Sequence, residues 1–205
     1  YDFEDGTQGF STLLLKAGQI GMDAADALTV AKDLVHGGKG ALSYTYKPEK
    51  ETFRALVANT QLPAGAQSLS FWIRSNTRTQ LILSLREEDD TSYEFPFFVP
   101  AHEWTQVTAN LSEFRLGNGT SDENGKLDVG QVNTLSVMDI ANILVTLPEG
   151  AVAVDLTSQR QLWLDDVKLA NDRAPHAMGE VTVAGQRITI ATSSSCISTH
   201  GMAPR

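Results

Sequence analysis

Short segments in which every second residue is apolar recur along this chain, and this pattern constrains its fold more than any other feature. The apolar positions of four such segments are Leu42, Tyr44 and Tyr46; Leu69, Phe71 and Ile73; Leu81, Leu83 and Leu85; and Tyr93, Phe95 and Phe97. Because side chains on a β-strand alternate between the two faces of a sheet, each segment predicts a strand with one buried and one solvent-facing side. About ten such strands, separated by turns rich in glycine, proline, asparagine and aspartate, predict an all-β protein built as a two-sheet antiparallel β-sandwich of the jelly-roll type.

The length and composition fit one such domain followed by a tail. Of the 205 residues, 41% are hydrophobic, which is enough to build a core in residues 1–170. We expect residues 171–205 to form a linker and a C-terminal tail, with a short hairpin around residues 184–185. No segment approaches the ~18 apolar residues of a membrane span, and a net charge of -9 argues against non-specific binding to nucleic acid. The single cysteine, Cys196, excludes an intramolecular disulfide.

The closing segment, residues 161–169, carries a carboxylate where the core is expected. Read with a period of two, one face holds Trp163, Asp165, Val167 and Leu169, whereas the other holds Leu162, Leu164, Asp166 and Lys168. If the first of these faces packs inside, Trp163 is a core residue and Asp165 is buried beside it. Burial of an isolated carboxylate is costly, so the sequence predicts that Asp165 is neutralised, paired or bound to a cation.

Five stretches of the chain carry a resemblance to known families. They are DFEDG at residues 2–6, GALSYTY at 40–46, LSFWIRS at 69–75, EWTQVTANLSEF at 103–114 and LWLDDVKL at 162–169. Together they resemble the carbohydrate-binding modules of the galactose-binding-like jelly-roll type, and they are also similar to the complex I intermediate-associated protein family. The resemblance covers about residues 1–170. It implies a jelly roll that binds a polysaccharide or oligosaccharide, with Trp104 packed under the edge of a sheet.

The resemblance also implies a structural calcium ion. In such modules an ion ties the first strand, a glycine turn and the last strand together, and the matching positions are Glu4, a backbone carbonyl near Lys39, and Asp165. Calcium takes six to eight hard oxygen ligands, which carboxylates and backbone carbonyls supply. The alternative is that Asp165 accepts hydrogen bonds from backbone N–H groups or pairs with an arginine or lysine. In either case Asp165 would serve stability.

The solvent-facing positions of three strands predict a ligand-binding surface. The residues that fall there are Trp72, Arg74, Ser84, Arg86 and Glu94, and they would lie across one sheet face if their strands are neighbours. Sugars suit such a surface, because their C–H faces stack on aromatic rings while their hydroxyls bond to charged side chains. Two arginines would also suit an acidic sugar. The alternative is a tryptophan covered by a loop and arginines paired with acids on an ordinary solvated face.

Catalysis finds little support in the sequence. The acidic run at residues 87–90 is predicted to be a solvated turn, and no zinc motif, nucleophile elbow or phosphate loop is present. We therefore expect a non-catalytic module, attached to or working with a larger polysaccharide-degrading enzyme. An extracellular or periplasmic location fits this role, and the chain opens without a signal peptide, so any export signal would already have been removed. A protein-interaction or assembly domain of the same fold is the second interpretation, and a glycan-active jelly-roll enzyme is the third.

Overall fold

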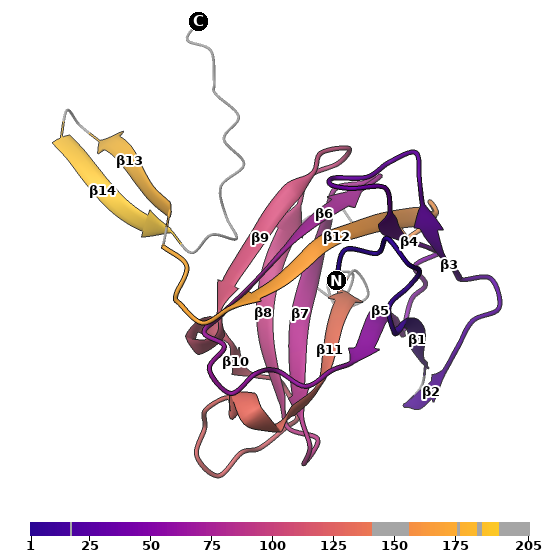
Figure 1. Cartoon of the computed structure of the whole chain (residues 1–205), viewed down its shortest axis with the longest axis horizontal. Coiled ribbons are helices and arrows are strands. Elements are labelled where there is room, and N and C mark those ends of the chain that lie inside the picture. The colour runs from indigo at the N-terminus through magenta and orange to yellow at the C-terminus, as the bar shows by residue number, and fades with distance from the viewer. Residues whose placement is uncertain (17, 141–155, 176, 184–185, 193–205) are drawn as a thin grey trace, which may run out of the picture.

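A computed structural model of the chain describes residues 1–16, 18–140, 156–175, 177–183 and 186–192. Its main body consists of two antiparallel sheets, which Figure 1 shows one in front of the other. The seven-stranded sheet has the order β10 (Arg115–Leu116), β8 (Ser92–Val99), β7 (Thr79–Glu87), β11 (Val132–Asp139), β5 (Thr52–Asn59), β1 (Phe10–Lys16) and β2 (Gln19–Gly21). The five-stranded sheet has the order β3 (Ala27–Ala31), β4 (Ala41–Tyr46), β12 (Arg160–Ala170), β6 (Ser68–Ser75) and β9 (Thr105–Asn110). The predicted two-sheet antiparallel sandwich is confirmed.

The predicted apolar faces of the strands meet between the two sheets. One row of side chains crosses the five-stranded sheet through Leu42, Leu164 and Ile73, and another crosses the seven-stranded sheet through Leu56, Val137 and Leu83. Each of these side chains is at most 2% exposed. Because full burial of a Leu, Ile or Val side chain stabilises by about 1.5–3 kcal/mol, such rows hold the layers together.

Strand β12 departs from the predicted alternation. Its core-facing residues are Leu162 and Leu164, each 1% exposed, whereas Trp163 is half-buried on the outward face. The prediction that Trp163 lies in the core is therefore wrong. Asp165 is nevertheless buried, at 1% exposure, because the register with β6 shifts after this residue and Asp166 adopts a left-handed φ of 52°. A β-bulge of this kind turns the following side chains to the other face of the strand.

Strand β11 was not predicted from the sequence. Its inward residues Val132, Leu135 and Val137 are not evenly spaced by two, since the register with β7 shifts between Val132 and Thr134. Because of this irregularity, the segment does not show the alternation with a period of two that predicts a strand. A strand was expected instead over residues 140–147, of which residues 141–147 lie outside the described residues. Residues 23–26 form a β-turn, which is closed by a hydrogen bond from the Asp26 N–H to the Asp23 carbonyl.

Two short 3-10 helices and a hairpin complete the structure. The helices, η1 (Leu111–Glu113) and η2 (Val129–Gln131), flank the loop that leads from β10 to β11. Strands β13 (Ala177–Val183) and β14 (Gln186–Thr192) pair only with each other, in a separate antiparallel sheet. In the described part of the chain, no helix has both the length and the apolar character that a membrane crossing requires.

Candidate functional site

The structure divides the five predicted ligand-binding residues between the two sheets. Trp72 and Arg74 lie on β6 of the five-stranded sheet, whereas Ser84 and Arg86 on β7 and Glu94 on β8 belong to the seven-stranded sheet. The two groups face outward on opposite sides of the sandwich. The expectation that all five share one face is therefore wrong, because β6 and β7 follow each other in sequence and not within a sheet.

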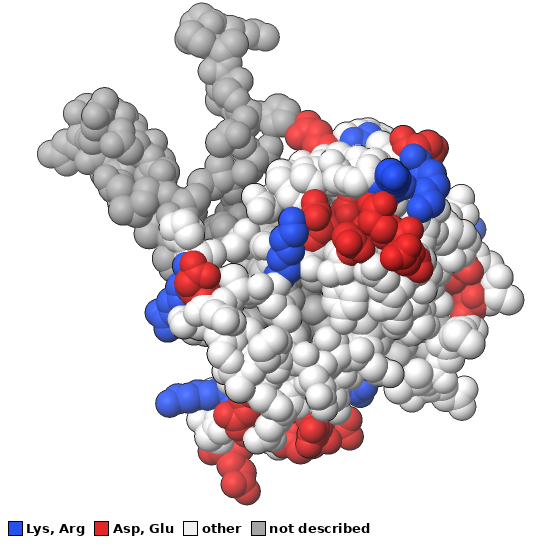
Figure 2. All heavy atoms as spheres, in the orientation of Figure 1, with Lys and Arg blue, Asp and Glu red and all other residues white. Residues whose placement is uncertain are grey.

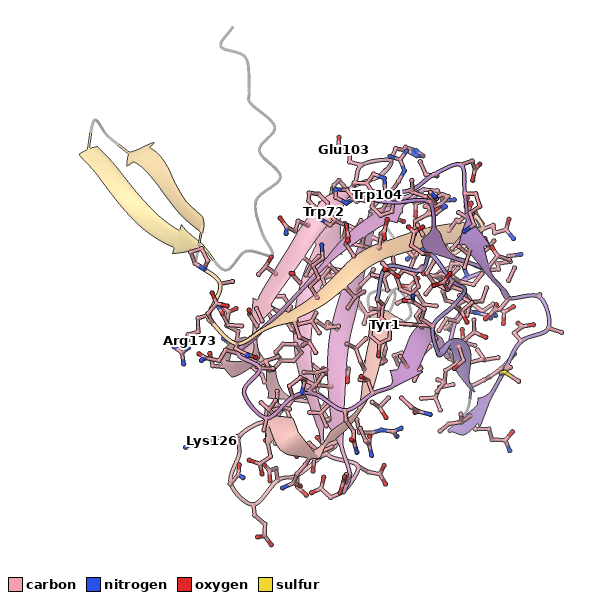
Figure 3. The ribbon with its side chains drawn as sticks, in the orientation of Figure 1. Tyr1, Trp72, Glu103, Trp104, Lys126 and Arg173 are labelled. Carbon is pink, nitrogen blue, oxygen red and sulfur yellow. The ribbon has the colours of Figure 1, made fainter. Side chains whose placement is uncertain are left out.

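One ring face of Trp72, on the side of the glycine turn at residues 36–40, is covered. The imidazole of His36 stacks on its indole, with ring centroids 3.8 Å apart and an interplanar angle of 13°. Trp104 contacts the same imidazole edge-on, at 5.7 Å, and it is half-buried instead of packed in the core. Figure 3 shows Trp72 and Trp104 close together at one end of the sandwich. On this ring face Trp72 matches the alternative interpretation, in which a loop covers the tryptophan.

Ser84 and Glu94 lie side by side on the outer face of the seven-stranded sheet. They are direct partners across β7 and β8, Ser136 on β11 pairs with Ser84 on the other side, and Arg115 on β10 pairs with Glu94. The next row of the same face consists of Pro96, Ile82 and Met138. We call this surface the Glu94 face, and define it by Ser84, Glu94, Arg115, Ser136, Ile82, Pro96 and Met138.

Glu94 is the carboxylate among the residues that define this face. It is half-buried, and among the described residues no hydrogen bond or ion pair engages it. Burial raises the pKa of Glu94 above its ordinary value. Gly117 allows the loop after β10 to pass closely, since a Cβ at that position would lie 3.0 Å from Glu94 Oε1. A partly desolvated carboxylate without a fixed donor is well suited to accept hydrogen bonds from a ligand.

The surroundings of Glu94 combine small polar groups with an apolar flank. Ser84 and Ser136 are buried, at 5% and 9% exposure, so their hydroxyls lie at the bottom of the face. Ile82, Pro96 and Met138 supply apolar surface beside them. Arg86 lies near the end of β7 and forms an ion pair with Asp90 at 3.5 Å, and both side chains are exposed. Such a surface can bond to hydroxyls and contact C–H groups at the same time.

The three predicted calcium ligands come together at one junction. Asp165 Oδ2 accepts hydrogen bonds from the backbone N–H groups of His36 and Gly37 at 2.9 and 3.0 Å, and its Oδ1 accepts one from Asp166 at 2.8 Å. Glu4 Oε1 accepts a bond from the N–H of Lys39, so Lys39 contributes a donor there. The carboxylates are of the type that calcium prefers, but they are directed at N–H groups. Within the described residues, no group of three or more His, Cys, Asp or Glu side chains could hold a metal ion.

This arrangement corresponds to the alternative considered for Asp165. Three N–H donors account for its burial without a cation, since hydrogen bonds to the charged form stabilise a carboxylate. Gly38 is required for the neighbouring contact between Glu4 and the N–H of Lys39, because a Cβ on Gly38, whose φ is 58°, would overlap Glu4 Oε1. A calcium ion at this junction stays a prediction.

The sequence did not single out several residues of the Glu94 face. Ser136 and Met138 were missed together with β11, whose bulge breaks the alternation. Ile82 and Pro96 stand at outward positions of segments that were otherwise predicted correctly. These residues could have been found from the sequence as outward-facing positions on the strands next to Ser84 and Glu94. That step requires the strand order, which the sequence did not provide.

No protein-family model matches the chain, and no curated protein of similar sequence was found. Solved structures do resemble it. A family 11 carbohydrate-binding module from Clostridium thermocellum, in complex with a β-1,3-1,4-mixed-linked tetrasaccharide, aligns with a TM-score of 0.58 at 12% identity, over 82% of this chain and 92% of that one. The family 11 module of a cellulosomal cellulase of the same organism aligns with a TM-score of 0.57 at 14% identity, over 86% and 95%.

A larger enzyme contains the same fold as one part. An exo-β-agarase aligns with a TM-score of 0.56 at 13% identity, and the match covers 85% of this chain but only 25% of the agarase chain. These similarities give no support to the second resemblance, to the complex I intermediate-associated proteins. At such low identity they establish the fold and not the ligand. The chain has the jelly-roll β-sandwich fold of carbohydrate-binding modules.

Proposed function

We propose that this chain is a non-catalytic carbohydrate-binding module whose Glu94 face binds a polysaccharide. The observation that carries the proposal is the half-buried Glu94 carboxylate, which has no partner among the described residues and lies beside Ser84. Sugar hydroxyls would donate to Glu94 and exchange hydrogen bonds with the two serines. The C–H groups of the sugar rings would contact Ile82, Pro96 and Met138.

Binding is favoured over catalysis by the number of carboxylates. Hydrolysis of a glycosidic bond usually requires a pair of carboxyl groups about 5–9.5 Å apart. The residues that define the Glu94 face include a single carboxylate. The jelly-roll enzyme consequently ranks below the binding module.

We also infer that the module serves a larger polysaccharide-degrading enzyme, in an extracellular or periplasmic location. The exo-β-agarase supports this inference, since a fold like this one makes up about a quarter of its chain. Attachment would keep the catalytic domain of such an enzyme on an insoluble substrate.

Calorimetric titration against a panel of glycans tests the binding face. The panel should include mixed-linkage β-glucan, xylan, agarose fragments and acidic glycans. We expect Glu94→Ala to weaken the binding of the recognised glycan about tenfold or more, because a hydrogen bond to a charged group contributes about 1.5–3 kcal/mol. The change breaks no hydrogen bond within the described residues, so the variant should remain folded.

Glu123→Ala is the matched control, because Glu123 is an exposed carboxylate in the loop between β10 and η2. Equal loss in both variants would argue against a specific site. A folded protein that binds no glycan of the panel would overturn the proposal and leave the protein-interaction domain as the better interpretation.

A further inference from the structure

A pocket of about 460 Å³ lies at one end of the sandwich, and no residue that defines the Glu94 face lines it. Its lining residues are Ala66, Gln67, Leu111, Ser112, Phe114, Gly125, Lys126, Leu127, Val129 and Arg173. They come from the β5–β6 loop, η1 and the residue after it, the loop between β10 and η2, η2 itself, and the linker after β12. None of them belongs to the residues that were predicted to bind sugar or calcium. The volume falls in the range of about 300–1,000 Å³ that is typical of small-molecule sites.

The lining of the pocket is apolar at its base and cationic at its rim. Leu111 and Phe114 are buried parts of the core, and Leu127 and Val129 pack against that core. Lys126 and Arg173 are exposed and lie on the same flank of the molecule in Figure 3. Figure 2 shows, in the same orientation, the lysine and arginine side chains on this side of the molecule in blue.

Neither cation has a partner in the part of the chain that the structure describes. The lysines and arginines that do form ion pairs in the described part of the chain are Lys16, Lys50, Arg54, Arg86, Arg160 and Lys168. The acids next to them in sequence, Asp128 and Asp172, are not among the lining residues. Two cations without an ion-pair partner among the described residues therefore line one pocket, in a chain whose net charge is -9.

The linker holds Arg173 in place over the pocket. Its backbone is bonded on both sides of Arg173, since Ser68 Oγ donates to the Asp172 carbonyl at 2.8 Å and the Ala174 N–H donates to Asn110 Oδ1 at 2.8 Å. One residue earlier, Gln67 Nε2 donates to the Asn171 carbonyl at 2.8 Å. The linker is thus attached to the sandwich by side chains from the β5–β6 loop, the start of β6 and the end of β9, and this attachment positions the backbone of Arg173.

The loop that carries Lys126 is held in a similar way. The N–H of Lys126 donates to Asn124 Oδ1 at 2.7 Å and to Asp122 Oδ2 at 3.1 Å. Asp122 is in turn bonded by the Tyr93 hydroxyl, which belongs to β8 of the core. Both cations therefore stand on backbone segments whose positions are fixed before a ligand arrives, and such preorganisation lowers the cost of binding.

We propose that this pocket is a second ligand site, which takes an organic carboxylate. The carboxylate would lie between Arg173 and Lys126, with the planar guanidinium donating two parallel hydrogen bonds. The body of the ligand would contact Leu111 and Phe114. An inorganic anion would leave this apolar base without a partner, and a neutral sugar would leave both cations unused. Two sources share this chemistry, namely the uronate end of an acidic glycan and a free carboxylic acid with an apolar body.

Two-dimensional NMR titration of the full chain tests the site, with digalacturonate and benzoate as probes of the two sources. The neutral disaccharide galactobiose is the comparison. We expect one of the charged probes to shift the amide signals of Gly125 and Leu127, and to bind at least about tenfold more tightly than galactobiose. Stronger binding of digalacturonate would assign the site to glycan ends, and stronger binding of benzoate to free acids.

Arg173→Gln and Lys126→Gln should each weaken the binding of the recognised probe about tenfold. Lys47→Gln is the control for charge alone, because Lys47 is an exposed cation beyond β4, which pairs with the beginning of β12 and not with its linker end. The site would be refuted if neither charged probe binds, if galactobiose binds equally well, or if the pocket variants bind like Lys47→Gln. Since Glu94 is not a lining residue, failure of glycan binding at the Glu94 face would leave these outcomes unchanged.

Discussion

Buried polar side chains link the two sheets at the scale of single residues. Arg160 on β12 donates to Asp139 on β11 at 2.7 Å, and the Tyr46 hydroxyl donates to the same carboxylate oxygen at 2.7 Å. Burial, together with the charge of Asp139, raises the pKa of Tyr46 well above its ordinary value, so the phenol keeps its proton. These bonds cross the core from one layer to the other, and we infer that they fix how the layers are aligned.

Glu87 is a buried carboxylate that lowers stability when it is charged. It is 2% exposed at the end of β7, and burial raises its pKa, with a further contribution from the negative charges of Asp128, Asp122 and Asp89. A raised pKa in the folded state means that stability is complete at a pH below the ordinary value and is lost as the pH rises through the raised value. We therefore expect Glu87→Gln to melt at a higher temperature than the natural chain at pH 7.

The gain should shrink as the pH falls through the raised pKa and should vanish below the ordinary value of about 4, where the natural carboxyl is protonated in both states. Thermal unfolding of both proteins across this range measures the effect. Glu88→Gln, which changes the exposed neighbouring carboxylate, is the control and should show no such pH-dependent gain in melting temperature. A lower melting temperature of Glu87→Gln at pH 7 would mean that the bond from the Asp128 N–H to the charged carboxylate outweighs the cost of burial.

At the scale of elements, β12 connects the glycine turn to the core. The bulge after Asp165 allows Leu164 and Asp165 to be buried one after the other, so the strand packs in the sandwich and also bonds to the turn. The first residues of the chain join the same place, since the Val167 N–H donates to the Tyr1 carbonyl at 2.9 Å. The two ends of the domain are thus held together by one strand.

Loss of the Asp165 carboxylate should loosen this junction. We expect Asp165→Ala to lower the free energy of unfolding by about 3 kcal/mol, because it leaves the N–H groups of His36 and Gly37 without an acceptor. Urea denaturation measures the loss. The calcium prediction adds a second expectation, namely that a chelator lowers the melting temperature of the natural chain but not that of Asp165→Ala. If the chelator leaves the natural chain unchanged, the backbone hydrogen bonds alone explain Asp165.

At the scale of the whole molecule, the linker belongs to the sandwich and the hairpin does not. The linker backbone is bonded to side chains of Gln67, Ser68 and Asn110, whereas β13 and β14 pair with each other. The boundary expected after residue 170 therefore falls before these contacts. No residue that defines the Glu94 face lines the pocket at the linker.

Two truncations distinguish these roles. A chain that ends at Pro175 should keep the melting temperature of the full chain, because it retains the bonded linker. A chain that ends at Ala170 loses these hydrogen bonds and should melt roughly 5 °C lower or more, given about 1 kcal/mol for each bond. Differential scanning calorimetry of the three proteins provides the comparison. Equal melting temperatures of the two truncated chains would show that the linker contributes nothing to stability.

The sequence by itself determined the fold class, because alternation along each strand depends only on which residues are apolar. It also indicated that Asp165 needs partners if it is buried, whereas the bulge in β12 is what buries it. The tertiary structure decided what local periodicity cannot express. Strand order placed Trp72 and Glu94 on opposite layers, a bulge hid β11, a second bulge turned Val167 inward on the strand where Trp163 faces outward, and the path of the linker brought Arg173 to the pocket. Each of these depends on contacts between residues far apart in the chain, and a pattern that repeats every second residue carries no information about them.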